Sequence, residues 1–398
     1  MTVPAPRVRR RTSMMGRLLP LLLVAALLAP LGLLLAQSWR HTGDERDLTA
    51  RERLGVQYLR ALAPVTEALV EAQSAAVSGR PVPGEPLTRA VEQAATVDAR
   101  IGAELRSQER WAGLRAKLEA LRDRSPADPE SAYTAYGEVT DLLLDLHDKV
   151  RASSGLIRDQ GADSYFLQDS AGEELPEAVV AAGRLADLGT LASRRPAAER
   201  PRSMVELTSL RVSALGPAND VVDNLRAAVD SSESTDLGAN VLTPLDAYQR
   251  SVEALAAYSA PAPDTGVVDQ GQLAAAALNS RNAARQLQPV ILGELDALLV
   301  ERIDGLDRER WVTAGAGTVA LLLLAWLATL LIAAGRRARR RAAVLPSADV
   351  DSPGTPPPGD LWHPSGGTGR PADQRPLQPV GAAQNPEIAH WGPFDASR

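Results

Sequence analysis

The sequence predicts an all-α membrane protein in which a large helical domain lies between two membrane-spanning helices. Of the 398 residues, 45% are apolar and only 4% aromatic, which is typical of an Ala- and Leu-rich helical interior. Two runs, Leu18–Ala36 and Val312–Ala334, stay uncharged over 19 and 23 residues. Each is long enough to cross the hydrocarbon core as a helix. The chain between them shows no alternating strand pattern.

Arginines flank both runs on the side away from the central domain. The predicted topology determinants are Arg9, Arg10 and Arg11 before the first run and Arg336, Arg337, Arg339, Arg340 and Arg341 after the second. By the positive-inside tendency, both termini are cytoplasmic and residues 37–311 lie outside the plasma membrane. Trp39 and Trp311 sit just outside the two runs, where indole rings anchor in the headgroup zone.

A cleaved signal peptide is the alternative for the first run, because a basic segment before an apolar stretch suits both. Its 19 apolar residues exceed a usual signal core, and cleavage after Ala36 would put the bulky Leu34 where a small residue is expected. We therefore expect a two-pass protein. Its parts are residues 1–17 (basic N-terminus), 18–36 (first span), 37–311 (extracytoplasmic domain), 312–334 (second span) and 335–398 (basic juxtamembrane segment and Pro-rich tail).

Charge and composition exclude several functions. The segment 37–311 carries a net charge of −13, which argues against nucleic acid or an anionic lipid surface as its partner. The chain has no Cys, so disulfides, thiolate metal sites and Cys nucleophiles are excluded. P-loop, nucleophile-elbow and HExxH patterns do not occur. We expect no enzymatic activity, no cofactor and no metal site.

Turn-forming stretches divide the central segment into helices. The first helix carries apolar residues at steps of four and three: Leu54, Tyr58, Ala61, Val65, Ala68, Ala72 and Ala75. Asp128 is a candidate N-cap for a helix whose first position is Pro129. The stretch from Gln160 to Gly172 is expected to be irregular. The expected helices cover residues 44–78, 87–124, about 129–150, 175–192, 198–231, 237–259 and from 268 into the second span.

Helices with short connections, whose two ends both return to the membrane, indicate an antiparallel up-and-down bundle. Because 275 residues overfill a single four-helix bundle, we expect two stacked four-helix bundles that share the long first and last helices. Homodimerisation through these long helices is a further expectation. The tail 342–398 contains eleven Pro and is predicted to be disordered. Its HWGPF stretch, 390–394, is a candidate peptide for a cytoplasmic protein.

The best candidate site lies in the irregular stretch. Three carboxylates and a phenol there suit an ammonium group or a cation; they belong to Asp159, Asp163, Tyr165 and Asp169. The alternative is that the acids cap helix ends while Tyr165 fills the core. A second candidate set, suited to a carboxylate solute, comprises Arg51, Arg60, Arg151 and Arg158, with local ion pairing as its alternative. His147 is interpreted as a solvated or capping residue.

Two stretches resemble the extracytoplasmic ligand-binding regions of bacterial methyl-accepting chemotaxis proteins and related transmembrane sensor kinases and diguanylate cyclases. They are RERLGVQYLRALAPV (51–65) and SSGLIRDQGADSYFLQD (153–169). In that family the first follows an E-R-x-G-x-x-Y-L-x-x-L pattern, and the second matches its D-S-Y segment at Asp163, Ser164, Tyr165 and Asp169. A closing L-L-x-x-R-I-x-x-L pattern matches Leu298, Leu299, Arg302, Ile303 and Leu306.

The resemblance covers about residues 37–335 and implies a helical-bundle sensor domain, single or stacked. The family's HAMP linker and its signalling, kinase or cyclase modules have no counterpart after Arg341. We therefore expect a sensor-like protein that binds a small solute and relays its state to a separate partner. The alternative is a structural envelope scaffold that binds no solute and recruits partners through its tail.

Overall fold

The computed structural model describes residues 15–157, 162–232, 235–261 and 268–343, and these ranges are helical without a strand. The all-α prediction is confirmed for them. The elements are α1 (Met15–Ser78), α2 (Gly84–Ile101), α3 (Gln108–Asp123), α4 (Pro129–Ser154), α5 (Ala162–Asp169), a π-helix (Ser170–Glu174), α6 (Leu175–Arg194), a 3₁₀ turn (Ala197–Glu199), α7 (Arg200–Ser231), α8 (Thr235–Tyr258) and α9 (Gln270–Ala343).

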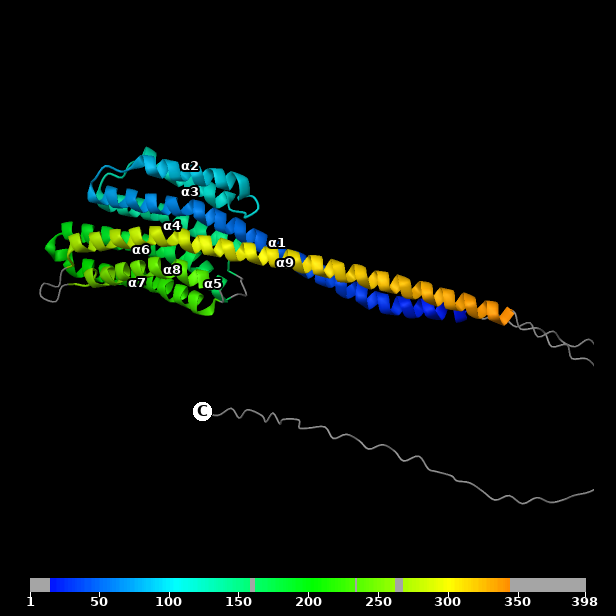
Figure 1. Ribbon diagram of the computed structural model, residues 1–398. Helices are drawn as coiled ribbons and strands as arrows, with labels where there is room; N and C mark the ends of the chain where they lie inside the picture. Colours follow the sequence, from blue (N-terminus) through cyan, green and yellow to red (C-terminus); the bar gives the residue numbers. More distant parts are fainter. Residues whose placement is uncertain (1–14, 158–161, 233–234, 262–267, 344–398) are drawn as a thin grey trace, which may run out of the picture. The chain divides into compact units, whose positions relative to one another are not determined.

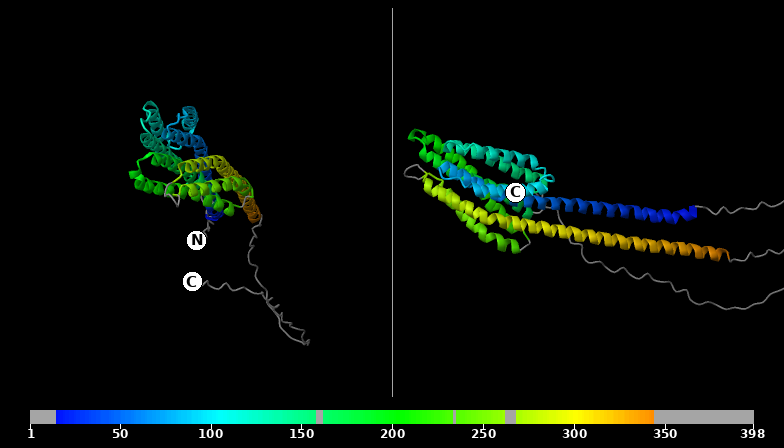
Figure 2. Two further views of the ribbon diagram at one scale, coloured as in Figure 1. Left: turned by 90° about the vertical axis from the view of Figure 1, so that its left-hand side faces the viewer. Right: turned by 90° about the horizontal axis from the view of Figure 1, so that it is seen from above.

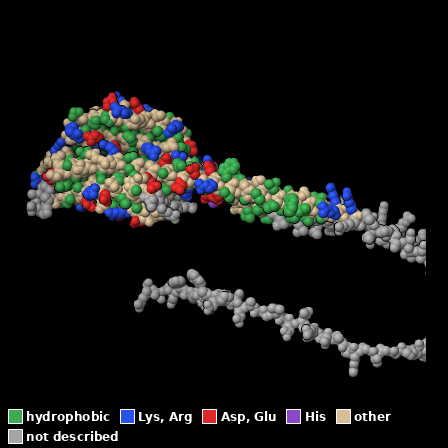
Figure 3. Space-filling view, in the orientation of Figure 1, with side chains coloured by type: hydrophobic (Ala, Val, Ile, Leu, Met, Phe, Trp, Pro, Cys, Tyr) green, Lys and Arg blue, Asp and Glu red, His purple; other side chains and the backbone are tan. Residues whose placement is uncertain are grey.

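Two long helices, α1 and α9, leave the bundle at the same end (Figures 1 and 2). In the described part of the chain, one helix is long and apolar enough to cross a membrane, the stretch Gln270–Arg337 of α9. Figure 3 shows hydrophobic side chains along the protruding stretch and charged side chains at its two ends. The first apolar run is helical within α1, and the side chains of residues 18–25 and 27 lie outside the description.

One stretch of α1 packs against two groups of helices. The Tyr58 hydroxyl donates to Asp98 of α2 (2.8 Å), Thr66 lies 3.3 Å from His147 of α4, and the Gln73 amide donates to Asp187 of α6 (2.9 Å). Helices α2 and α3 therefore pack on α1 and α4, while α7 and α8 pack beyond α6 and α9 (Figures 1 and 2). The two groups lie side by side along α1, and the expected stacking of two four-helix bundles is not confirmed.

The apolar spacing of the first long helix is confirmed, because its pattern faces the interior. Tyr58, Val65, Ala72 and Ala75 have no exposed surface. Tyr58, Val65 and Ala72 belong to the main core, which draws side chains from both groups of helices. A second, smaller core is built only from α6, α7, α8 and the start of α9, with Leu185, Leu207, Leu255 and Leu273 among its members.

The single helix expected over 87–124 is wrong, because the chain turns between α2 and α3. Asp98 accepts hydrogen bonds from Tyr58 (2.8 Å) and from the Ser107 hydroxyl (3.1 Å), and it thereby holds the turn to α1. Leu105 is fully buried inside the turn, and Arg106 takes a left-handed φ of 52°. Polar and apolar contacts to a distant helix outweigh the local helical preference here.

The predicted start of the helix at Pro129 is confirmed. The Asp128 carboxylate accepts from the Ser131 amide (2.9 Å), and Pro129 occupies the first turn. Gly155 ends this helix with φ of 97°, a conformation that favours glycine. Local turn chemistry therefore sets both ends of α4.

Several predictions fall outside the described residues. They include Arg9, Arg10 and Arg11, the disorder of the tail from 344, and the HWGPF peptide. At the other basic cluster, Arg336, Arg337 and Arg340 are exposed, and Arg339 and Arg341 lie within α9.

Candidate functional site

The stretch predicted to be irregular is mostly helical, and it does not gather the predicted residues into one site. Asp159 lies outside the described residues, and Asp163 lies in the first turn of α5. Tyr165 is 44% exposed and packs edge-on against Phe166, with ring centroids 5.6 Å apart. Only Asp169 enters a network of charges. Its carboxylate accepts from Arg151 (3.1 Å) and from the Asn224 amide of α7 (3.0 Å).

A π-helix follows α5 directly and shapes this region. Its five residues, Ser170–Glu174, join α5 to α6 without a break in the helical path. A Cβ on Gly172 would lie 2.6 Å from Cδ of Arg151, so only glycine lets the arginine stem pass. π-helical turns are rare and often mark functional sites. The wide turn of the π-helix therefore leaves room for the buried side chain of Arg151.

Arg151 of α4 is the centre of this arrangement, and its side chain is 8% exposed. It forms ion pairs with Asp169 (3.1 Å), Glu173 and Asp148 (3.8 Å). We call Arg151, Asp169, Glu173, Glu174 and Asp220 the crossover network. From the sequence, Asp169 belongs to the first candidate set and Arg151 to the second, arginine-based set. In that set Arg60 instead donates to the Leu292 carbonyl, Arg51 is exposed, and Arg158 lies outside the described residues.

Carboxylates outnumber cations in the crossover network. Burial, together with this excess of negative charge, raises the pKa of Glu174 and of Asp169. Burial, followed by the charges of Asp220 and Asp169, raises the pKa of Glu174 to about 7. Burial also raises the pKa of Asp169 above its ordinary value, despite Arg151 beside it. The network therefore binds and releases protons near neutral pH.

His147 corrects the sequence-based interpretation, because it lies in the core. It is 1% exposed, and its Nε2 lies 3.3 Å from the Thr66 hydroxyl. Burial, followed by the charge of Arg151, lowers the pKa of the imidazole to about 3. His147 is therefore neutral at physiological pH and ties α4 to α1. Its apolar neighbours Leu143, Leu146 and Val150 share the buried face of α4.

Among the residues that the structure describes, no group of three or more His, Asp or Glu side chains has an arrangement that holds a metal ion. The crossover network offers charge and hydrogen bonding to a ligand. Its Arg151 is largely occupied by its own carboxylates.

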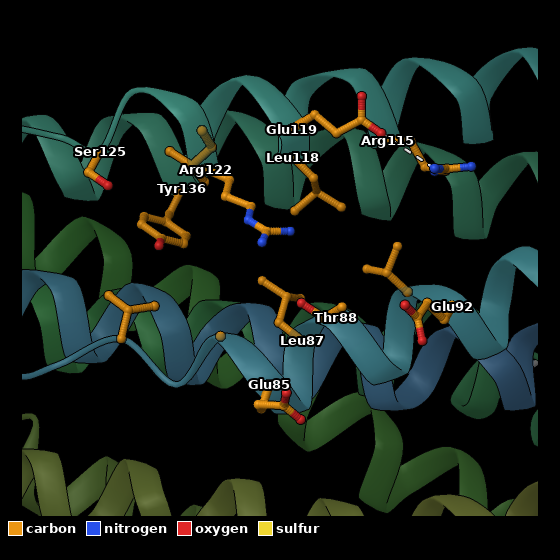
Figure 4. A pocket seen from close by; sticks show the side chains of 14 residues that line it. Glu85, Leu87, Thr88, Glu92, Arg115, Leu118, Glu119, Arg122, Ser125 and Tyr136 are labelled. Atoms are coloured by element: carbon orange, nitrogen blue, oxygen red, sulfur yellow. Dashed lines mark hydrogen bonds and ion pairs between the residues drawn. The ribbon is translucent and has the colours of Figure 1, made fainter.

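A groove of about 670 Å³ lies between α2 and α3. Figure 4 shows Leu118 and Arg122 of α3 pointing toward Leu87 and Thr88 of α2. Every charged residue that lines the groove is exposed, and Arg115 pairs with Glu119 on its own helix (3.4 Å). The groove thus offers no buried charged group to a solute.

The predicted membrane anchors occupy one level of α1 and α9. The Arg310 guanidinium lies over the Trp39 ring, 4.6 Å from its centroid, and Trp311 is 79% exposed. A cation above an indole face is a stabilising contact. It links the two long helices where the predicted spans begin.

No protein-family model, curated protein or solved structure matches the chain. The resemblance to chemoreceptor sensor regions therefore stays a prediction.

Proposed function

We propose that this protein is a non-enzymatic, membrane-anchored sensor that relays the state of an extracytoplasmic helical domain to a separate cytoplasmic partner. The observation that carries the proposal is the continuous pairing of α1 with α9. This pairing extends from deep in the bundle to the start of the apolar stretch of α9.

Five residues of α1, each seven positions after the last, contact α9 in order. We call them and their partners the α1–α9 seam. Arg46 pairs with Asp307 (2.7 Å), Arg53 with Asp296 (2.8 Å) and Glu67 with Arg285. Between them Arg60 donates to the Leu292 carbonyl (3.1 Å). At the membrane end the Arg310 guanidinium lies over the Trp39 ring. Seven residues make nearly two helical turns, so all five lie on one face of α1.

The polarity of the seam reverses along its length. Among its ion pairs, α1 supplies the cation nearer the membrane, as in Arg46 with Asp307, whereas deeper in the bundle α9 supplies it, as in Arg285 with Glu67. The hydrogen bond to Asp296 raises the pKa of Arg53, and the charge of Asp304 adds to this effect. Sliding α9 along α1 would move these charges away from their partners. The seam therefore couples the positions of the two helices.

The structure supports a two-pass topology in the plasma membrane as part of the proposal. A Cβ on Gly317, inside the apolar stretch of α9, would lie 3.2 Å from Leu35 of α1. The first apolar run thus lies beside the second, as expected of two neighbouring spans. The basic clusters in the sequence on the far side of both runs support our proposal that both termini are cytoplasmic.

α9 provides the path for the signal. It is one uninterrupted helix from Gln270 to Ala343, so a displacement in the bundle reaches the basic cluster at Arg336 without crossing a loop. Shifts of one packed helix against another are an established way to transmit a change of state. We place the output on a protein that contacts the Pro-rich segment 342–398, with homodimerisation through the long helices as part of the same proposal.

The absence of native Cys allows a direct test in the full chain. Spin labels at S38C and T313C report the distance between α1 and α9 at the membrane boundary, in lipid nanodiscs. The substitution R53E, about 21 Å from Trp39 along the helix, puts a carboxylate beside Asp296 and Asp304. We expect it to shift or broaden the distance distribution measured by pulsed electron paramagnetic resonance.

The control is R115E, because Arg115 pairs with Glu119 on the exposed surface of its own helix α3 (3.4 Å), away from the seam. We expect R115E to leave the distance unchanged. Identical distributions in the unsubstituted chain and in R53E would contradict the relay. They would favour the alternative, a static scaffold that binds no small ligand and recruits partners through its tail.

A further inference from the structure

A second cavity, of about 370 Å³, lies where α1, α6 and the beginning of α9 meet, far from the membrane end of the bundle. Its lining reaches from Leu278, which is 46% exposed, to Asp187, which is 4% exposed. The volume is within the lower range of small-molecule sites. It therefore offers a solute a path from solvent to a buried charge.

Small side chains create the space. α6 contributes Gly183 and Ala186, and α9 contributes Ala274 and Ala277. A Cβ on Gly183 would collide with Val70, so α6 packs directly on α1 at this level. One wall of the cavity is thus held by a tight helix contact, which suits a site formed before its ligand arrives.

At the buried end, the Asp187 carboxylate lacks a cation. Its Oδ2 accepts from the Gln73 amide (2.9 Å), and no ion pair to it is formed by the residues that the structure describes. Burial raises the pKa of Asp187 to about 6, although hydrogen bonds from Gln73 and Ser74 and the charge of Arg281 oppose the shift. A buried carboxylate without a cationic partner is costly, and a ligand ammonium group would remove that cost.

Arg281 supplies the opposite charge in the same cavity. Its side chain is 12% exposed, and one terminal nitrogen pairs with Glu71 at 3.3 Å. Its buried Nε has no hydrogen-bond partner among the described residues. A guanidinium with Nε available can bind a carboxylate through two parallel hydrogen bonds. Arg281 thus provides a carboxylate subsite.

We infer that this cavity binds a small zwitterionic solute, whose carboxylate pairs with Arg281 and whose ammonium group pairs with Asp187. Ser74, Thr190 and Gln270 supply further polar contacts along the wall. A solute held in this way contacts α1, α6 and α9 at once, and α1 and α9 are the helices that continue to the membrane. The inference deepens the proposed function and rests on it for its role, while binding is measured independently.

The test is calorimetric titration of the full chain in nanodiscs with L-alanine, L-serine, L-threonine and L-glutamine, each alone. We expect at least one to bind with Kd below about 1 mM. R281Q and D187N should each weaken that binding at least about tenfold. R250Q is the matched control, because Arg250 lies on α8 outside the α1–α9 seam, is 70% exposed and does not line the cavity. It should bind as the unsubstituted chain does.

A further variant keeps every charge, so that the test does not depend on charge substitutions that could disturb folding. A274L fills the cavity with an apolar side chain and should abolish binding, while circular dichroism checks that each variant stays helical. Failure of all four amino acids to bind at about 10 mM would overturn the inference, as would unchanged binding by R281Q and D187N. Binding without any change in the S38C–T313C distance would support the cavity and contradict the relay. A distance that responds to R53E without amino acid binding would do the reverse.

Discussion

At the scale of single residues, two buried titratable groups pull the stability of the domain in opposite directions. His147 is neutral in the fold, with a pKa of about 3 against an ordinary 6.5. As pH falls below 6.5, the unfolded chain takes up a proton that the folded chain refuses, so stability is lost. Asp187 has a raised pKa, about 6, so its contribution to stability falls as pH rises from 4 to 6.

We predict that H147Q removes part of the acid sensitivity of the protein. Between pH 7.5 and pH 5, protonation of the unfolded imidazole costs the original chain about 2 kcal/mol of unfolding free energy, a cost that H147Q does not bear. The measurement is chemical denaturation of the full chain in detergent micelles at the two pH values. H41Q is the control, since His41 is exposed and should leave the loss intact. Equal losses in H147Q and the original chain would contradict the buried, neutral imidazole.

At the scale of elements, the π-helix depends on the contact between Gly172 and Arg151. We predict that G172A lowers the free energy of unfolding by about 1–3 kcal/mol, because the new methyl group displaces an arginine stem whose charged end is fixed by Asp169 and Glu173. Chemical denaturation of the full chain measures the loss.

The matched control is G113A, in α3, where a Cβ meets no atom within 4 Å. It should be neutral or stabilise the protein by up to about 1 kcal/mol, since alanine favours helix over glycine. Equal effects of the two substitutions would show that Arg151 has room to move aside.

Elements that depend on local chemistry were predictable, and those that depend on distant partners were not. Asp128 and Pro129 signal their helix start within four residues of sequence. The turn between α2 and α3 depends on Tyr58, forty residues before Asp98. The crossover network escaped prediction for the same reason, because Arg151 meets Asp169 and Asn224 only through tertiary packing.

At the scale of the whole molecule, the sequence predicted the class of fold but not the placement of its two groups of helices. The apolar spacing of α1 shows which residues are buried, yet Tyr58, Thr66 and Gln73 contact three different helices within sixteen residues. Periodicity cannot say which neighbour covers which face. The side-by-side arrangement follows from these separate polar contacts.

The proposed topology predicts opposite accessibility on the two sides of the membrane. Single-Cys variants S231C, in the exposed end of α7, and S347C, after α9, can be compared in intact spheroplasts with a membrane-impermeant maleimide. We expect S231C to react at once and S347C only after permeabilisation. The reason is that the basic cluster at Arg336 keeps the segment after the second span in the cytoplasm. Labelling of both variants before permeabilisation would contradict the two-pass topology.

The seven-residue spacing of the α1–α9 seam also limits how the gene can change in length. One residue inserted between Arg46 and Arg53 would rotate Trp39 and Arg46 by about 100° relative to the bundle, away from Asp307 and Arg310. An insertion of seven residues would rotate them by only about 20°. It would restore contact with α9 only if α9 lengthened to match. The distance from the helical bundle to the predicted spans can therefore change only through paired insertions close to a whole number of helical turns, such as seven or about eleven residues.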